Sequence, residues 1–236
     1  MTNPDLSNWQ PRPAPQREPL AGRFVRLEPL DSAHHGDELW LALQGPGCDP
    51  ALWDYLAYGP FASREPFDAW LAGNAASADP LFYVVIELAS GRALGLLSYL
   101  RIAPRDGCIE IGHIAFGQAM QRSPASTEAV WLLARHAFDD LGYRRLEWKC
   151  NALNTRSMHA AARLGFTYEG LFRQHMVVKG RNRDTAWFAI LDSEWPACRD
   201  AFEHWLASDN FDAEGRQKQR LEALREAPAA VLHATT

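Results

Sequence analysis

Residues 109–166 read IEIGHIAFGQAM, QRSPAS, TEAVWLLARHAFDDLGY, RRLEWKC and NALNTRSMHAAARLGF, and this stretch decides the fold. Its hydrophobic pattern predicts a strand, a loop, a helix, a short strand and a second helix. A strand that ends in a short loop before an amphipathic helix leaves several backbone N–H groups pointing at one spot. This arrangement is typical of a phosphate site, although an ordinary loop-to-helix junction has the same pattern.

The first helix is predicted from residue 127 to 141. Gly142 ends it, Ser126 or Thr127 can cap its start, and Glu128 adds negative charge to the first turn. Pro124 suits a position at or just before a helix start, where no N–H is needed. The apolar stripe consists of Val130, Leu133, Ala134, Ala137, Phe138 and Leu141.

The two elements that follow agree with this interpretation. Residues 145–150 alternate polar and apolar as a short strand does. Residues 154–165 are typical of a helix that ends at Gly165. Its inward side chains are Met158, Ala161, Ala162 and Leu164.

With these residues in view, the chain resembles the GNAT superfamily of acyl-CoA-dependent N-acyltransferases, and within it the RimJ/RimL type that acetylates N-terminal amines of ribosomal proteins. The resemblance covers most of residues 22–196. It implies an α/β (α+β) fold with a mostly antiparallel, splayed central sheet flanked by helices, and acetyl-CoA as acyl donor. The matching residues are Glu110 to Gly112, Gln121 to Ala129, Asn154, Ser157, Leu164 to Phe166, Glu169, Gly170, Arg173, Asp184, Glu194 and Trp195.

Two positions depart from the family pattern. Pro124 stands where the loop's central glycine is expected, which removes one N–H donor and stiffens the backbone. Ala161 stands where many members carry a tyrosine that acts as the acid. We interpret the first departure as altered loop geometry, and the second as moving the acid role to Ser157.

The resemblance also implies a set of cofactor-binding residues. Asn154 contacts the pantetheine arm, and Ser157 lies near the sulfur, where it can protonate or solvate the thiolate. An N-cap role is compatible with the position of Asn154. Backbone N–H groups near Ile114, Ala115 and Phe116 hold the thioester carbonyl. The loop donors are Gln121, Arg122, Ser123, Ala125, Ser126 and Thr127.

Acyl transfer to an amine requires a base that takes the amine proton and a donor for the leaving thiolate. Glu110 is the first choice for the base, directly or through water. The alternative is a structural carboxylate bonded to backbone or to Arg101. His113 lies three residues further along the strand, so alternation places it on the opposite face, and we expect it to pack.

Two segments are candidates for the acceptor site. Trp53, Tyr55 and Tyr58 lie between predicted helices over residues 32–43 and 64–76, and they either line the acceptor groove or pack. A later hairpin joins strands 168–178 and 185–191 through residues 179–184. Its Arg173 and Asp184 are the residues we favour for acceptor binding, the alternative being ion pairs on a solvated face.

Composition narrows the function classes. The chain has 236 residues, 47% hydrophobic and 22% charged, with a net charge of -5, which is ordinary for a globular enzyme and unlike a nucleic-acid-binding protein. The four cysteines are widely separated, so we expect neither a metal site nor disulfides. No signal-like or membrane-spanning run occurs, so we expect a cytoplasmic protein with no membrane partner.

The organisation expected is a proline-rich arm over residues 1–21, an acetyltransferase domain over 22–208 and a C-terminal helical appendage and tail over 209–236, with a helix at 211–226. The remaining expected elements are a strand at 23–28, a hairpin of strands 81–87 and 93–102, and a helix at 193–206. Trp9 docks on the domain or on a partner subunit. Whether the protein is a homodimer stays open.

The function expected is transfer of acetyl from acetyl-CoA to a primary amine, either a protein N-terminus or a small molecule. No cysteine lies in the matched motifs, which favours direct transfer in a ternary complex. The alternative is a non-catalytic acyl-CoA-binding or partner-binding protein on the same scaffold. An acyl donor other than acetyl-CoA also fits the sequence.

Overall fold

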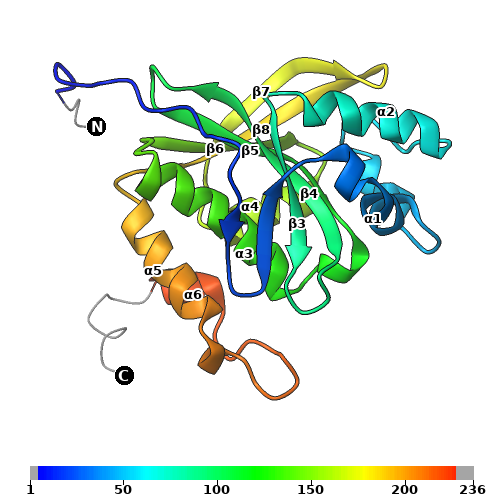
Figure 1. Cartoon of the computed structure of the whole chain (residues 1–236). Helices are drawn as coiled ribbons and strands as arrows, with labels where there is room; N and C mark the ends of the chain where they lie inside the picture. Colours follow the sequence, from blue (N-terminus) through cyan, green and yellow to red (C-terminus); the bar gives the residue numbers. More distant parts are fainter. Residues whose placement is uncertain (1–4, 227–236) are drawn as a thin grey trace.

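The computed structural model describes residues 5–226, and its centre is an eight-stranded sheet in the order β1-β2-β3-β4-β5-β6-β8-β7 (Figure 1). All neighbouring strands are antiparallel except β5 and β6, which run parallel. The strands are β1 Leu20–Ala21, β2 Val25–Pro29, β3 Leu81–Glu87, β4 Ala93–Ala103, β5 Cys108–Phe116, β6 Arg145–Asn151, β7 Thr167–Val178 and β8 Arg181–Leu191.

Helices cover both faces of this sheet. On one face lie α1 Ser32–Gln44 and α2 Arg64–Ala75, and on the other lie α3 Pro124–Arg135, α4 Thr155–Arg163, α5 Trp195–Leu206 and α6 Leu221–Glu226. Shorter turns complete the chain: η1 Pro50–Trp53, η2 Gln118–Met120, the π-helical η3 His136–Asp140 and η4 Ser208–Asn210. The mostly antiparallel sheet with flanking helices confirms the expected fold class.

A bulge in β5 reverses the side-chain alternation of that strand. Ser98 pairs with Gly112 and Leu96 with Ala115, so β5 contributes one more residue than β4 over this interval. The extra residue is His113, whose φ of 51° lies in the left-handed region. Strict alternation would place Glu110 and His113 on opposite faces. The bulge instead places both on the face that α1 and α2 cover, and this expectation from the sequence was wrong.

The sheet opens between β5 and β6. Their ladder consists of three pairs, of which the last joins Glu110 to Glu147, and beyond it the strands separate. The edge of β5 past Glu110 therefore has no strand partner on this side within the described residues. This opening is the splay expected for the fold, and it positions the site.

Most elements lie where the sequence predicts them, and three differ. The first core helix begins at Pro124 rather than at residue 127, because the proline takes the first helical position. In the last hairpin the turn contains only residues 179 and 180, so residues 181–184, three of which are charged, belong to strand β8.

The third difference lies in the C-terminal appendage. The helix predicted over residues 211–226 forms only at Leu221–Glu226, after a turn held by hydrogen bonds among residues 210–219. Leu221 and Leu224 are buried against the core, as the sparse apolar spacing suggests. Residues 227–236 of the appendage lie outside the described residues.

The N-terminal arm lies along the domain. Trp9 donates a hydrogen bond from Nε1 to the carbonyl of Arg105 at 2.8 Å. Its ring lies so close to Gly107 that a Cβ atom added there would be only 2.5 Å away. Trp9 therefore packs on its own domain, which is one of the two surfaces considered from the sequence. Residues 1–4 of the arm lie outside the described residues. Within residues 5–226, no helix has the length and apolar character needed to cross a membrane.

Candidate active site

A cavity of about 200 Å³ occupies the opening between β5 and β6. Its walls come from β4, β5, β6, β7, β8, from η1 with the segment that follows it, and from the start of α4. Segments far apart in the sequence thus meet at one point of the sheet. Five predicted site residues line this cavity together: Tyr55, Glu110, Ile114, Asn154 and Ser157.

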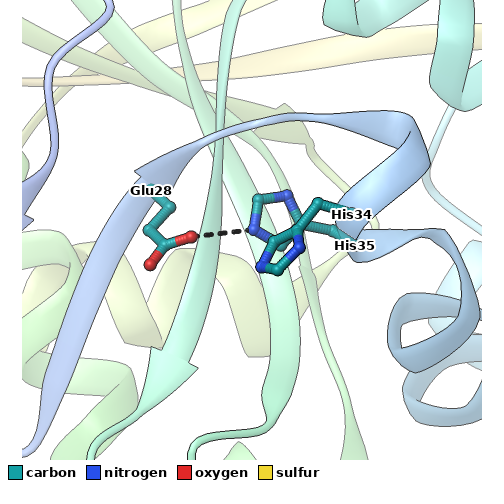
Figure 2. A group of neighbouring side chains, drawn as sticks. All are labelled: Glu28, His34 and His35. Carbon is teal, nitrogen blue, oxygen red and sulfur yellow. Dashed lines mark hydrogen bonds and ion pairs between the residues drawn. The ribbon is translucent and has the colours of Figure 1, made fainter.

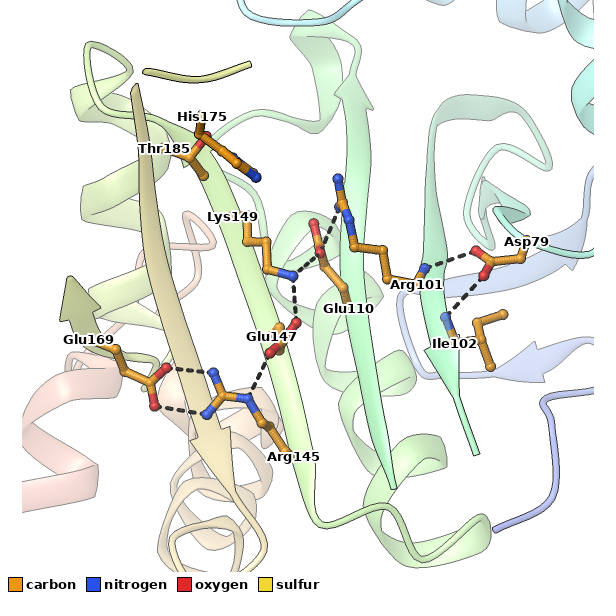
Figure 3. A network of polar contacts seen from close by, with 10 residues as sticks. All are labelled: Asp79, Arg101, Ile102, Glu110, Arg145, Glu147, Lys149, Glu169, His175 and Thr185. Carbon is orange, nitrogen blue, oxygen red and sulfur yellow. Dashed lines mark hydrogen bonds and ion pairs between the residues drawn. The ribbon is translucent and has the colours of Figure 1, made fainter. Parts of the chain in front are cut away.

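Glu110 is bound by two cations. Its side chain is 3% exposed, and its Oε2 lies 2.8 Å from Arg101 Nη1 and 2.9 Å from Lys149 Nζ (Figure 3). Lys149 also contacts Glu147 Oε2 at 2.6 Å and lies 3.8 Å above the ring of Trp187. The pairing of Glu110 with Arg101, which was the alternative considered from the sequence, is therefore present in the structure. Both ion pairs use Oε2, so Oε1 of Glu110 takes part in neither.

The ion-pair network continues along β6 and supports the position of Lys149. Arg145 contacts both Glu147 and, with two hydrogen bonds, Glu169. Burial raises the pKa of Glu147, but hydrogen bonds from Lys149 and Arg145 outweigh it and hold the pKa below its ordinary value. The Arg145 guanidinium also lowers the pKa of Glu169. These carboxylates are thereby kept ionised.

Backbone geometry fixes Arg101 beside Glu110. Arg101 has a φ of 47°, at an irregularity where β4 and β5 change register. The Asp79 carboxylate accepts hydrogen bonds from the backbone N–H groups of Arg101 at 2.9 Å and Ile102 at 3.1 Å, as Figure 3 shows. This bond pair stabilises a left-handed conformation that a long side chain rarely adopts.

His113 lines the same cavity in its neutral form. Burial, and then the charges of Arg101 and Arg183, lower the pKa of His113 from 6.5 to about 4. Its Nδ1 lies 2.9 Å from the hydroxyl of Tyr58, and its ring also packs on Phe82. The expected packing role of His113 is present, together with an unexpected position in the cavity wall.

Asn154 and Ser157 project from the start of α4. The Asn154 Oδ1 accepts a hydrogen bond from the backbone N–H of Ser157 at 3.1 Å, so the asparagine is the N-cap of that helix. Ser157 Oγ accepts from Trp148 Nε1 at 3.0 Å, which positions the hydroxyl in the cavity wall. Cys150 lies in the same wall, and burial raises the pKa of its thiol.

The expected phosphate loop lies outside the cavity wall, and its residues from Pro124 onward form the first turn of α3. Ser123 occupies the N-cap position but makes no side-chain cap bond, so the N–H groups of Ala125, Ser126 and Thr127 in the first turn are uncapped by it. Arg122 is exposed with a φ of 58°. The Gln121 amide donates to the Phe116 carbonyl at 3.2 Å, which ties the loop to the end of β5.

Neither residue expected to cap α3 does so. Ser126 Oγ donates to the Ser123 carbonyl at 2.9 Å, and Thr127 Oγ1 accepts from Arg163 at 2.9 Å. Glu128 lies beyond the first turn and is 1% exposed, with its carboxylate accepting from three backbone N–H groups at 2.6–2.8 Å. Those three donors are Arg23, Phe24 and Val25. Glu128 thus holds the β1–β2 connection on α3.

The remaining predicted residues are dispersed. Ile114 lines the cavity, whereas Ala115 is fully buried and Phe116 is partly buried. Trp53 is fully buried in the core. Tyr58 is not part of the cavity wall, but its hydroxyl is hydrogen-bonded to His113, which is. The buried Trp53 ring therefore packs rather than facing an acceptor.

The two hairpin residues favoured from the sequence also lie outside the cavity wall. Arg173 is exposed on β7. The Asp184 carboxylate accepts from the Gln174 N–H at 2.7 Å and from Asn182 Nδ2 at 2.8 Å, which stabilises an irregularity of β7 where Gln174 has a φ of 52°. The contacts of Asp184 are thus local to the β7–β8 hairpin, and its role in acceptor binding stays a prediction.

Sequence reasoning did not place Lys149 or Cys150 in the site, and it placed Arg183 only among the charged residues of the last hairpin. Alternation on β6 could have indicated Lys149, since Leu146, Trp148 and Cys150 are core residues and the charged ones share the other face. Arg183 was predicted in a loop, which concealed its face.

A separate group, Glu28, His34 and His35, has ligand atoms within 4.8 Å of one another and could hold a metal ion (Figure 2). His35 Nδ1 accepts from the Asp31 N–H at 3.1 Å, so the ring proton lies on Nε2 and is donated to Glu28 at 2.9 Å. A metal at Nε2 would force that proton onto Nδ1, against another donor. The group therefore fits a hydrogen-bonded helix start better than a metal site.

Comparison with known proteins agrees with this geometry. A family model described as the acetyltransferase (GNAT) domain matches residues 25–167. A GCN5-related N-acetyltransferase from Brucella melitensis is 50% identical with a TM-score of 0.91, over 94% of this chain and 100% of that chain. The uncharacterized N-acetyltransferase p20 of Bacillus licheniformis is 29% identical over 155 residues, which is 62% of this chain and 84% of that protein.

A structure of the ribosomal-protein acetyltransferase RimL in complex with coenzyme A shares the fold, with 22% identity and a TM-score of 0.62 over 74% of this chain and 98% of that chain. The resemblance stated from the sequence is thereby confirmed. Because the family model covers more than half of the chain, this protein belongs to the GNAT acetyltransferases and is an acetyl-CoA-dependent N-acetyltransferase.

Proposed function

We propose that this enzyme transfers the acetyl group directly from acetyl-CoA to a primary amine in a ternary complex. The observation that carries the proposal is the single cavity that Glu110, His113, Asn154 and Ser157 share at the opening of the sheet. An acceptor can enter on the α1–α2 face and meet a thioester seated between β5 and β6. The thioester supplies the acetyl group, and every other contribution comes from the chain.

The residues present fit such a donor. The unpartnered edge of β5 past Glu110 offers backbone donors to the pantetheine amides and the thioester carbonyl. The first-turn N–H groups of α3 suit a pyrophosphate, since Pro124 occupies the N1 position, whose N–H is one of several without a helical partner. We therefore propose the loop of residues 121–127 as the pyrophosphate site despite its proline.

Glu110 is the proposed base, acting through a water molecule. Its Oε2 is engaged by Arg101 and Lys149, which leaves Oε1 for the acceptor side. The amine loses a proton as it attacks the thioester, and a carboxylate can take that proton through water.

Ser157 is the proposed donor to the leaving thiolate, because its hydroxyl is positioned by Trp148 in the cavity wall. Cys150 is the one cysteine in this wall among the described residues, and burial keeps its thiol protonated at neutral pH. A protonated thiol is a poor nucleophile, which supports direct transfer over an acetyl-enzyme.

The test combines titration calorimetry with kinetics. Wild type should bind acetyl-CoA and acetylate a panel of amines, and Glu110→Gln should lower kcat by about 10²-fold with little change in acetyl-CoA affinity. Glu65→Gln, an exposed glutamate on α2, is the matched control. Absence of acetyl-CoA binding would overturn the proposal. An acetylated protein detected by intact mass during turnover would exclude direct transfer.

A further inference from the structure

Arg183 differs from every other cation of the cavity. Its Nε is buried and has no hydrogen-bond partner, and within residues 5–226 no carboxylate lies within ion-pair distance of its guanidinium. By contrast, Arg101 pairs with Glu110, and Lys149 pairs with both Glu110 and Glu147. The protein thus positions a half-buried guanidinium without giving it an anion.

Arg183 lies in the wall of the proposed reaction site. Arg183 lines the cavity with Glu110, His113 and Ser157. Its charge, after burial and Arg101, helps to lower the pKa of His113, so it acts at short range on the cavity wall. Burial also lowers the pKa of Arg183, although an arginine remains protonated at neutral pH.

The charges around the cavity do not balance. Three cations, Arg101, Lys149 and Arg183, line the cavity with one carboxylate, Glu110, and His113 is neutral at pH 7. Glu110 and Glu147 hold Arg101 and Lys149, so Arg183 is the cation left without a carboxylate partner. A buried charge without a partner costs free energy, and a bound ligand that supplies the partner recovers it. The planar fork of a guanidinium matches a carboxylate with two parallel hydrogen bonds.

We propose that the acceptor is a small amine that carries a carboxylate, such as an amino acid, and that Arg183 binds this carboxylate. The inference rests on the proposed function and names its substrate class. The two ends of a zwitterion then have complementary partners, since the carboxylate meets Arg183 on β8 and the amine meets Glu110 on β5. The small volume and the apolar side chains of Leu52, Leu56 and Met176 suit a compact acceptor.

The experiment compares each amino acid with its carboxamide, which keeps the amine and the side chain but lacks the carboxylate. We expect wild type to show at least tenfold higher kcat/KM for acids than for amides. Arg183→Gln should bring that ratio close to one, and Arg183→Lys should retain part of it because a point charge remains without the fork. Arg181→Gln, at an exposed position two residues away on β8, is the matched control.

Three results would overturn the proposal. Wild type could use amides as well as acids, or Arg183→Gln could slow acids and amides equally, which would assign the arginine to the donor or the oxyanion. Third, the enzyme could acetylate peptides that begin with aspartate but no free amino acid, and the acceptor would then be a protein N-terminus rather than a small molecule.

A binding arm separates this inference from the proposed function. Amino acids and their amides are titrated into wild type and Arg183→Gln saturated with CoA, with acetyl-CoA affinity measured in parallel. If acids bind wild type at least tenfold tighter than the variant, the inference about Arg183 is supported. If no amine is turned over in that case, only the proposed function fails. Equal binding of acids and amides to wild type would contradict the inference about Arg183.

Discussion

Lowering the pH from 7 to 4 should destabilise the enzyme through His113. Burial and the nearby arginines hold its pKa at about 4, against 6.5 in the unfolded chain. Because the unfolded state binds the proton first, the stability from a neutral His113 is complete above pH 6.5 and is lost as the pH falls toward 4. A difference of about 2.5 pKa units corresponds to about 3 kcal/mol of unfolding free energy.

The variant His113→Asn isolates this contribution. Asparagine tolerates the left-handed backbone at this position, where φ is 51°, and it does not titrate. Urea unfolding at several pH values should show wild type losing about 3 kcal/mol more than the variant between pH 7 and pH 4. At about 2–4 °C per kcal/mol, the difference in Tm changes by roughly 6–12 °C over this range.

The exposed His159 provides the control, since His159→Asn removes one imidazole from the surface of α4. Its stability profile should run parallel to that of wild type. If the profile of His113→Asn also runs parallel, within about 0.5 kcal/mol, the argument that burial keeps His113 neutral is wrong.

Two further predictions concern buried carboxylate contacts. Lys149→Met removes a 5% exposed cation from between two glutamates, and chemical unfolding should show a loss of about 3 kcal/mol, whereas Lys218→Met at an exposed position should change less than about 0.5 kcal/mol. Glu128→Ala leaves three backbone N–H groups without their acceptor and should lower the unfolding free energy by about 3 kcal/mol. The control Glu203→Ala, at an exposed position, should change it by close to zero. Equal losses in the two variants would contradict the importance of the Glu128 contact.

Local signals in the sequence determined the elements and the family. Side-chain period depends on nearest neighbours along the chain, so the β3–β4 hairpin, β5, β6 and α4 follow from their own residues. Asn154 and Ser157 could be named from the resemblance to the family, and their spacing of one helical turn agrees with it, since both lie at one end of α4. Glu110 could be named as a candidate from its place on the strand. Its pairing with both Arg101 and Lys149 could not be predicted.

The tertiary structure decided the composition of the cavity. A one-residue bulge at His113, stabilised by pairing with β4, changes the face of every side chain that follows, and strict alternation in the sequence cannot indicate it. The turn at residues 179–180 likewise places Arg183 on a strand, where sheet order brings it beside β6. Charge balance is a sum over residues from distant segments, so the unpaired arginine exists only in the folded protein.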